Sequence, residues 1–215
     1  MSKRILAIVL ISALALGTVF AAKGDIRVGL NVGFGHDEMR TSFPGESYLY
    51  YNNGLYVAAD GSYEIADNVL LDLSAGIMTM GMCQLRINDE GTITTVVSDI
   101  STPANFSLYL GASYRFDISE EISVDAGAGF DMMTGGYMYS KENPMVEGRI
   151  GVGAEVSASY AVNRQINVIL GGRYSVYFLN TDENIVKLLN ETRYEDGGRV
   201  LQSDFKIFAG VTYAL

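Results

Sequence analysis

Apolar side chains occupy every second position in eight separate runs between residue 26 and the last residue. In the first run, residues 26–34, one face consists of Ile26, Val28, Leu30, Val32 and Phe34. The positions between them hold one arginine, one asparagine and two glycines. An amphipathic helix would repeat its apolar residues at spacings of three and four. The alternation therefore predicts extended strands, each with one apolar and one polar face.

The other seven runs cover residues 55–65, 69–77, 106–116, 122–132, 146–162, 166–178 and 205–215. No charged residue occurs on any apolar face, and the runs have about the nine to eleven residues that a tilted strand needs to cross a bilayer, or a few more. Short connections at 66–68, 117–121 and 163–165 alternate with long polar connections at 37–47, 81–104, 133–145 and 181–198. This arrangement predicts short turns on one rim and long loops on the other, which is typical of outer-membrane barrels.

The same alternation would also fit a soluble barrel with an apolar core, so the direction of the apolar face has to be argued separately. Many glycines lie on the polar face, which suits the narrow interior of a small barrel better than a solvent-exposed surface. Tyrosines end the apolar faces at the short-turn rim, as an interfacial aromatic girdle would: Tyr63, Tyr114, Tyr160 and Tyr213. We therefore expect an all-β fold, an eight-stranded antiparallel transmembrane up-and-down β-barrel with its apolar face towards lipid.

Residues 1–21 have the features of a signal peptide. Lys3 and Arg4 precede an apolar run at 5–16, and small residues allow cleavage between Ala21 and Ala22. We therefore expect export, a mature barrel domain at 22–215, and a location in the outer membrane of a Gram-negative cell. Cleavage would leave 13 basic and 25 acidic residues, a balance that argues against nucleic acid as a partner.

The chain resembles the superfamily of small eight-stranded outer-membrane barrels that includes outer-membrane protein A (its barrel domain), X and W. The last run alternates apolar residues up to Tyr213 and Leu215 and resembles the C-terminal assembly signal of that superfamily, although that signal usually ends in phenylalanine. The resemblance implies outer-membrane lipid, periplasmic chaperones and the barrel-assembly machinery as partners. We expect a monomer.

Charged side chains on the polar face should fill the lumen and pair with one another, because an unpaired buried charge is costly. The five basic and eight acidic residues are Arg27, Asp60, Glu64, Asp72, Arg115, Asp125, Asp131, Glu147, Arg149, Glu155, Arg173, Asp204 and Lys206. A tight turn centred on Arg164 would place Glu155 directly opposite Arg173.

Two further predictions concern local structure. Interior tyrosines should cover cross-strand glycines, with Tyr109 opposite Gly129 and Tyr177 opposite Gly151. Residues 81–104 should form a protruding hairpin with its turn at 88–91 and a break at Pro103.

Three classes of function fit this barrel. The first is a non-enzymatic surface protein whose loops serve adhesion, contact with a host or partner, or envelope integrity. The loops contain side chains typical of contact surfaces or of an upper aromatic girdle: Met39, Phe43, Tyr48, Tyr50, Tyr51, Tyr137, Met138 and Tyr139. The second is a small-solute pore or transporter, and the third is a lipid-modifying membrane enzyme.

The third class needs a histidine paired with a serine or an acid. The sole histidine, His36, continues the lipid-facing positions of the first strand, and no serine follows two residues later. One histidine and one cysteine, Cys83, give no basis for a metal site. We therefore expect no catalytic residues, no metal and no cofactor.

Overall fold

The computed structural model describes residues 26–43, 46–88, 93–101, 105–140, 143–180 and 199–215. The predicted signal peptide and the predicted loop at 181–198 lie outside these residues. The nine strands are β1 (Ile26–Phe43), β2 (Glu46–Ala66), β3 (Val69–Asn88), β4 (Ile93–Ser101), β5 (Asn105–Asp117), β6 (Ile122–Ser140), β7 (Asn143–Ala161), β8 (Ile166–Asn180) and β9 (Arg199–Ala214). None of the described residues belongs to a helix long and apolar enough to cross a membrane.

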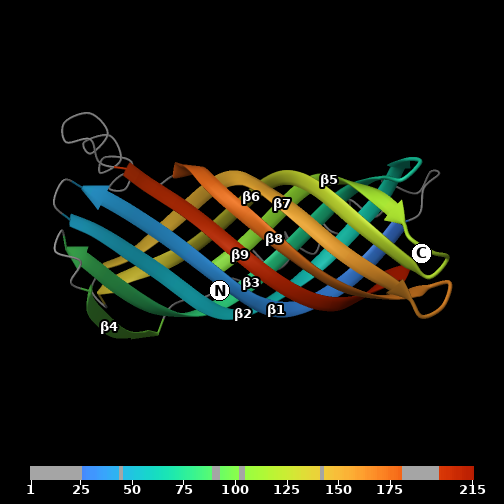
Figure 1. Ribbon diagram of the computed structural model, residues 1–215. Coiled ribbons are helices and arrows are strands. Elements are labelled where there is room, and N and C mark those ends of the chain that lie inside the picture. Colours follow the sequence, from blue (N-terminus) through green and yellow to red (C-terminus); the bar gives the residue numbers. More distant parts are fainter. Residues whose placement is uncertain (1–25, 44–45, 89–92, 102–104, 141–142, 181–198) are drawn as a thin grey trace.

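Eight of these strands close into an antiparallel up-and-down barrel (Figure 1). The order around the wall is β2-β1-β9-β8-β7-β6-β5-β3, and pairing of β2 with β3 completes the circle. β4 pairs with β3 outside this circle. The predicted fold class is therefore confirmed, with one additional strand at the long-loop end.

Each short turn is fixed by a side chain that accepts backbone N–H groups. Ser119 Oγ accepts from the amides of Glu121 and Ile122, and Asn163 Oδ1 accepts from those of Gln165 and Ile166. Between β2 and β3, Glu64 Oε1 accepts from the amide of Asn68, at 3.0 Å. Asn68 has a positive φ of 62°, a backbone conformation that asparagine tolerates better than most residues do.

The apolar faces point away from the barrel axis. Leu30, Leu55 and Leu170 are 62–66% exposed, and apolar side chains of all eight wall strands are exposed in the same way. Buried polar residues alternate with them along the strands. An apolar belt around a polar interior is the arrangement that a bilayer requires, so the predicted direction of the apolar face is confirmed.

Two predicted loops are strands instead. The described residues within 37–47 and 133–145 continue the strands of the β1–β2 and β6–β7 hairpins. The sequence prediction ended each strand where the apolar alternation ends. Backbone pairing continues beyond that point because it does not depend on an apolar face.

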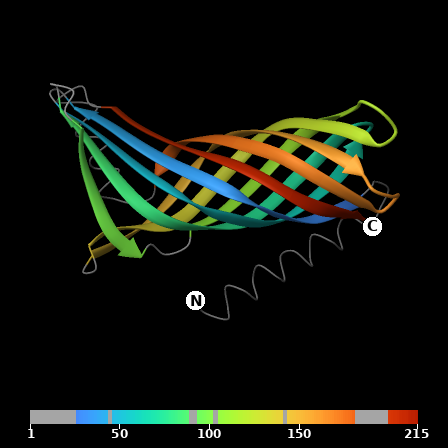
Figure 2. The same cartoon turned by 60° about the horizontal axis from the view of Figure 1, so that its bottom comes forward.

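The hairpin predicted within residues 81–104 is confirmed as a ribbon of two strands. Backbone pairs from Cys83–Val97 to Ile87–Ile93 join β3 to β4, and β4 leaves the barrel wall at the long-loop end (Figure 2). Most of the predicted turn and Pro103 lie outside the described residues.

Candidate functional site

The predicted charged residues with described side chains lie in the lumen. Twelve of the thirteen have described side chains and lie on the inward positions of their strands, whereas the side chain of Glu147 lies outside the described part. Several are almost completely buried, and Asp131 and Lys206 are 0% exposed. The most deeply buried of these charges are therefore shielded from bulk water and depend on one another.

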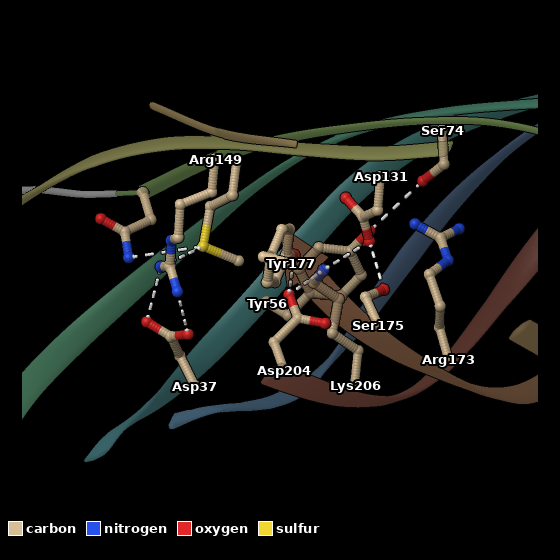
Figure 3. Close-up of polar contacts among 12 residues, drawn as sticks. Asp37, Tyr56, Ser74, Asp131, Arg149, Arg173, Ser175, Tyr177, Asp204 and Lys206 are labelled. Atoms are coloured by element: carbon tan, nitrogen blue, oxygen red, sulfur yellow. Dashed lines mark hydrogen bonds and ion pairs between the residues drawn. The ribbon is translucent and has the colours of Figure 1, made fainter. Parts of the chain in front are cut away.

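Three of these charged residues, Asp131, Asp204 and Lys206, form a central cluster with Ser175 and Tyr177 (Figure 3). Lys206 Nζ lies 2.5 Å from Asp204 Oδ2 and 3.3 Å from Asp131 Oδ2. Ser175 Oγ donates to Asp131 at 2.7 Å, and Tyr177 Oη donates to Asp204 at 2.7 Å. Because β7 and β8 separate β6 from β9 in the wall, the contact between Lys206 and Asp131 crosses the lumen.

A second ion pair crosses the lumen between Arg149 on β7 and Asp37 on β1. Its two hydrogen bonds measure 2.7 and 2.8 Å, and both residues are buried (Figure 3). The Arg149 guanidinium also lies 5.0 Å from the centre of the Tyr177 ring and donates to Met133 Sδ at 2.9 Å. Sequence reasoning missed Asp37, although the odd-numbered inward positions of β1 would have identified it had the strand been extended beyond Phe34.

The predicted pair of Glu155 and Arg173 is confirmed. The two residues are direct partners in the β7–β8 register, and Arg173 Nε donates to Glu155 Oε2 at 2.7 Å. The Arg173 guanidinium stacks 3.9 Å from the centre of the Tyr109 ring on β5, across the lumen. Nearer the short-turn rim, Arg115 forms two hydrogen bonds of 2.9 and 2.8 Å with its register partner Asp125.

The remaining predicted carboxylates with described side chains accept hydrogen bonds from neutral groups. Asn31 Nδ2 donates to Asp60, and Ser113 Oγ donates to Asp72 at 2.6 Å. Glu64 belongs to the β2–β3 turn and not to the central cluster.

A polar cavity of about 70 Å³ lies in the short-turn half of the lumen. Arg173, Tyr109 and Phe208 line its inner end, and Arg173 is the register partner of Lys206 in the central cluster. Arg27, Asp60, Asp72, Arg115, Asp125 and Glu155 also line it. The cavity therefore ends at the central cluster.

One of the two predicted tyrosine–glycine pairs is wrong in register. Tyr109 lies opposite Asp131, and Gly111 lies opposite Gly129, because the β5–β6 turn is centred one residue later than Ser119. The Tyr109 ring instead covers Gly111 on its own strand, where an added Cβ would lie 2.6 Å from Tyr109 Cζ.

The other predicted pair, Tyr177 and Gly151, is confirmed as direct partners. However, the atoms closest to an added Cβ at Gly151 belong to the neighbouring backbone and not to the ring. The Phe208 ring covers Gly171, a contact that was not predicted: an added Cβ there would lie 2.7 Å from two ring carbons.

The four rim tyrosines lie where the sequence placed them, close to the short-turn ends of β2, β5, β7 and β9. Tyr114, Tyr160 and Tyr213 are 41–50% exposed, and Tyr63 is half-buried. Their role as a girdle and the role of Tyr213 and Leu215 as an assembly signal stay predictions. The amide of Leu215 donates to the carbonyl of Ile26 at 2.9 Å.

His36 lies at an even-numbered position of β1, as do the lipid-facing residues. Its Nδ1 is 2.7 Å from Asn53 Oδ1, and its Nε2 is 3.7 Å from Glu38 Oε2. Among the described residues, no three histidine, cysteine or acidic side chains are grouped so that they could hold a metal ion.

No protein-family model and no curated protein sequence matches the chain. Among solved structures, Neisserial surface protein A is similar at 16% identity and a TM-score of 0.50, covering 86% of this chain and 96% of its own. The outer membrane protease OmpT from Escherichia coli is similar at 13% identity and a TM-score of 0.55, covering 89% of this chain and 97% of its own. Together with the closed eight-stranded wall, these similarities assign the chain the fold of the outer-membrane β-barrels.

Proposed function

We propose that the protein is a non-enzymatic integral barrel of the outer membrane. In this proposal the lumen is closed, and the barrel anchors loops that contact the exterior for adhesion, partner or host recognition, or envelope integrity. Partners at these loops would be extracellular. Lipid, periplasmic chaperones and the barrel-assembly machinery would be the partners of the monomeric barrel itself.

The observation that carries the proposal is the set of contacts that cross the lumen. Arg149 joins Asp37, Lys206 joins Asp131, and Arg173 stacks on Tyr109, each between strands that have two other strands between them in the wall. An eight-stranded barrel has an interior just wide enough for side chains to fill. Charged contacts across so narrow a lumen favour a closed barrel over a conducting one.

The long-loop end supports a display role. β1, β2, β3, β6 and β7 have 18–21 residues each, well beyond the nine to eleven that cross a bilayer. The excess lies at the end opposite the short turns, and the β3–β4 ribbon extends the same end. Such a rim would hold its loops clear of the lipid surface.

A catalytic role has less support than the display role. His36 contacts Asn53 and Glu38 on the outer-facing side of β1, away from the lumen charges. A conducting role is the stronger alternative, because the polar cavity already occupies the short-turn half of the lumen.

Planar-bilayer recordings test the closed lumen. The refolded protein should produce no unitary conductance steps, and reproducible steps from the folded monomer would favour the pore.

Display is tested by inserting an epitope tag between residues 141 and 142 and labelling intact cells with antibody. A matched tag between Ser119 and Glu120, in a short turn, should be labelled only after the outer membrane is permeabilised. Labelling of intact cells at the short turn alone would reverse the proposed orientation.

A further inference from the structure

In the short-turn half of the lumen, side-chain exposure falls between Glu155 and Arg173. The inward-facing carboxylates of Asp125 and Glu155 are 19% and 22% exposed as side chains, whereas Arg173 behind them is 3% exposed. The central cluster is fully buried at Asp131 and Lys206. The polar cavity is therefore a recess that is closed towards the long-loop end.

Seven of the eight wall strands each contribute one charged side chain to this recess. The seven residues are Arg27, Asp60, Asp72, Arg115, Asp125, Glu155 and Arg173. Three are basic and four are acidic, so their formal charges sum to −1. Because the surrounding wall excludes bulk water, a net negative recess favours a positively charged occupant.

The excess negative charge can be assigned to the β2–β3 wall. Two of the carboxylates in the recess are paired with arginine, Asp125 with Arg115 and Glu155 with Arg173. Asp60 and Asp72 instead accept from Asn31 and Ser113, and within the described residues neither forms an ion pair.

Two residues that line the recess each have a buried polar atom without a hydrogen-bond partner among the described residues. Arg173 Nη1 and Asn31 Oδ1 are buried, and neither has a hydrogen-bond partner among the described residues. Arg173 is 2% exposed and Asn31 is 3% exposed, so bulk water does not hydrate these atoms freely. A buried donor and a buried acceptor without partners cost stability unless an occupant of the recess satisfies them.

We propose that this recess binds a small organic cation that also carries a hydroxyl group, entering from the short-turn end. Its ammonium group would lie at Asp60 and Asp72 with Asn31 Oδ1 as a further acceptor, and its oxygen would accept from Arg173 Nη1. The cavity volume corresponds to about five water molecules, which limits the ligand to about five non-hydrogen atoms. An amino alcohol of the size of ethanolamine has this charge, this hydroxyl group and this size.

The test is an NMR titration of the ¹⁵N-labelled, refolded mature protein in detergent micelles with ethanolamine. We expect saturable shifts at the amides of Glu155 and Arg173, and no shift at residues near Asp37 on the closed side. Ethylene glycol and acetate, which share the size but lack the positive charge, should give no saturable shifts. Equal binding of ethylene glycol, or the absence of saturation with ethanolamine, would overturn the proposal and leave water as the occupant.

Variants distinguish ethanolamine binding in the recess from a general attraction to negative surface charge. Asp60→Asn should weaken ethanolamine binding by about tenfold, because it removes a charge-assisted hydrogen bond. Ser62→Leu keeps every charge but fills part of the recess, so it should also abolish saturation. Glu120→Gln removes an acid of the same rim outside the recess and should leave binding unchanged. Loss of binding in Glu120→Gln equal to that in Asp60→Asn would contradict a specific site.

Discussion

At the scale of single residues, Arg173 connects three parts of the lumen: it pairs with Glu155, stacks on Tyr109 and is the register partner of Lys206. Replacing Arg173 with alanine leaves the Glu155 carboxylate without its cation and should cost about 3 kcal/mol of unfolding free energy. Removing both partners should cost less than the two single changes added together. Urea unfolding in lipid, arranged as a double-mutant cycle, measures this coupling.

The control for this cycle is an exposed ion pair of the same barrel. Arg40 and Glu38 lie 3.1 Å apart at the long-loop end, and the Arg40 side chain is 57% exposed. Arg40→Ala should therefore change the unfolding free energy by less than about 0.5 kcal/mol. Additive losses for Arg173 and Glu155 would show that the lumen pair contributes no more than a surface pair.

The glycine at position 171 provides a second prediction for a single residue. A Cβ there would lie 2.7 Å from the Phe208 ring and 2.8 Å from Ser157 Cβ, so Gly171→Ala forces the packed lumen to shift. We expect a loss of about 1–3 kcal/mol, as for other overpacked cores. Gly61→Ala is the matched control, because its Cβ would meet nothing closer than 3.9 Å. Similar losses of unfolding free energy for the two variants would exclude the ring contact as the cause.

Among the elements, the β2–β3 hairpin depends on the backbone conformation of Asn68. With a φ of 62°, this residue occupies the left-handed region, which costs most residues about 1–2 kcal/mol and costs glycine nothing. Asn68→Ala should therefore lower the unfolding free energy by about 1 kcal/mol, whereas Asn68→Gly should be close to neutral. Urea unfolding of the two variants side by side measures the difference, and equal stability would mean that the turn relaxes to another conformation.

How much of each element could be predicted from the sequence depends on what determines its boundaries. β5 was predicted within one residue at each end, because its apolar alternation ends where its pairing ends. The loop-side ends of β1, β2 and β6 were missed, because their pairing continues beyond the point where the regular apolar alternation ends. Pairing across a tight turn gave Glu155 and Arg173 correctly, whereas the longer β5–β6 turn shifted the partner of Tyr109 by two residues.

Contacts that cross the lumen could not be predicted from the sequence. Asp37 and Arg149 lie 112 positions apart in the sequence and on strands that are not neighbours. Whether their side chains meet depends on the stagger of all the strands around the closed wall. The apolar alternation within a single strand gives no information about that stagger. The composition of the lumen could therefore be predicted, but its cross-lumen pairs and the position of its cavity could not.

For the whole molecule, these contacts predict a lumen that is accessible from one end and closed in the middle. Ser62 lines the cavity in the short-turn half, whereas Ser107 is buried beyond Tyr109, towards the long-loop end. Each can be replaced by cysteine with little change in volume, in a protein whose native Cys83 has been changed to serine. A small cationic methanethiosulfonate should modify Ser62→Cys in the folded protein and should reach Ser107→Cys only after unfolding, with mass spectrometry counting the adducts. Modification of both positions at the same rate in the folded state would mean that the long-loop half of the lumen is not closed.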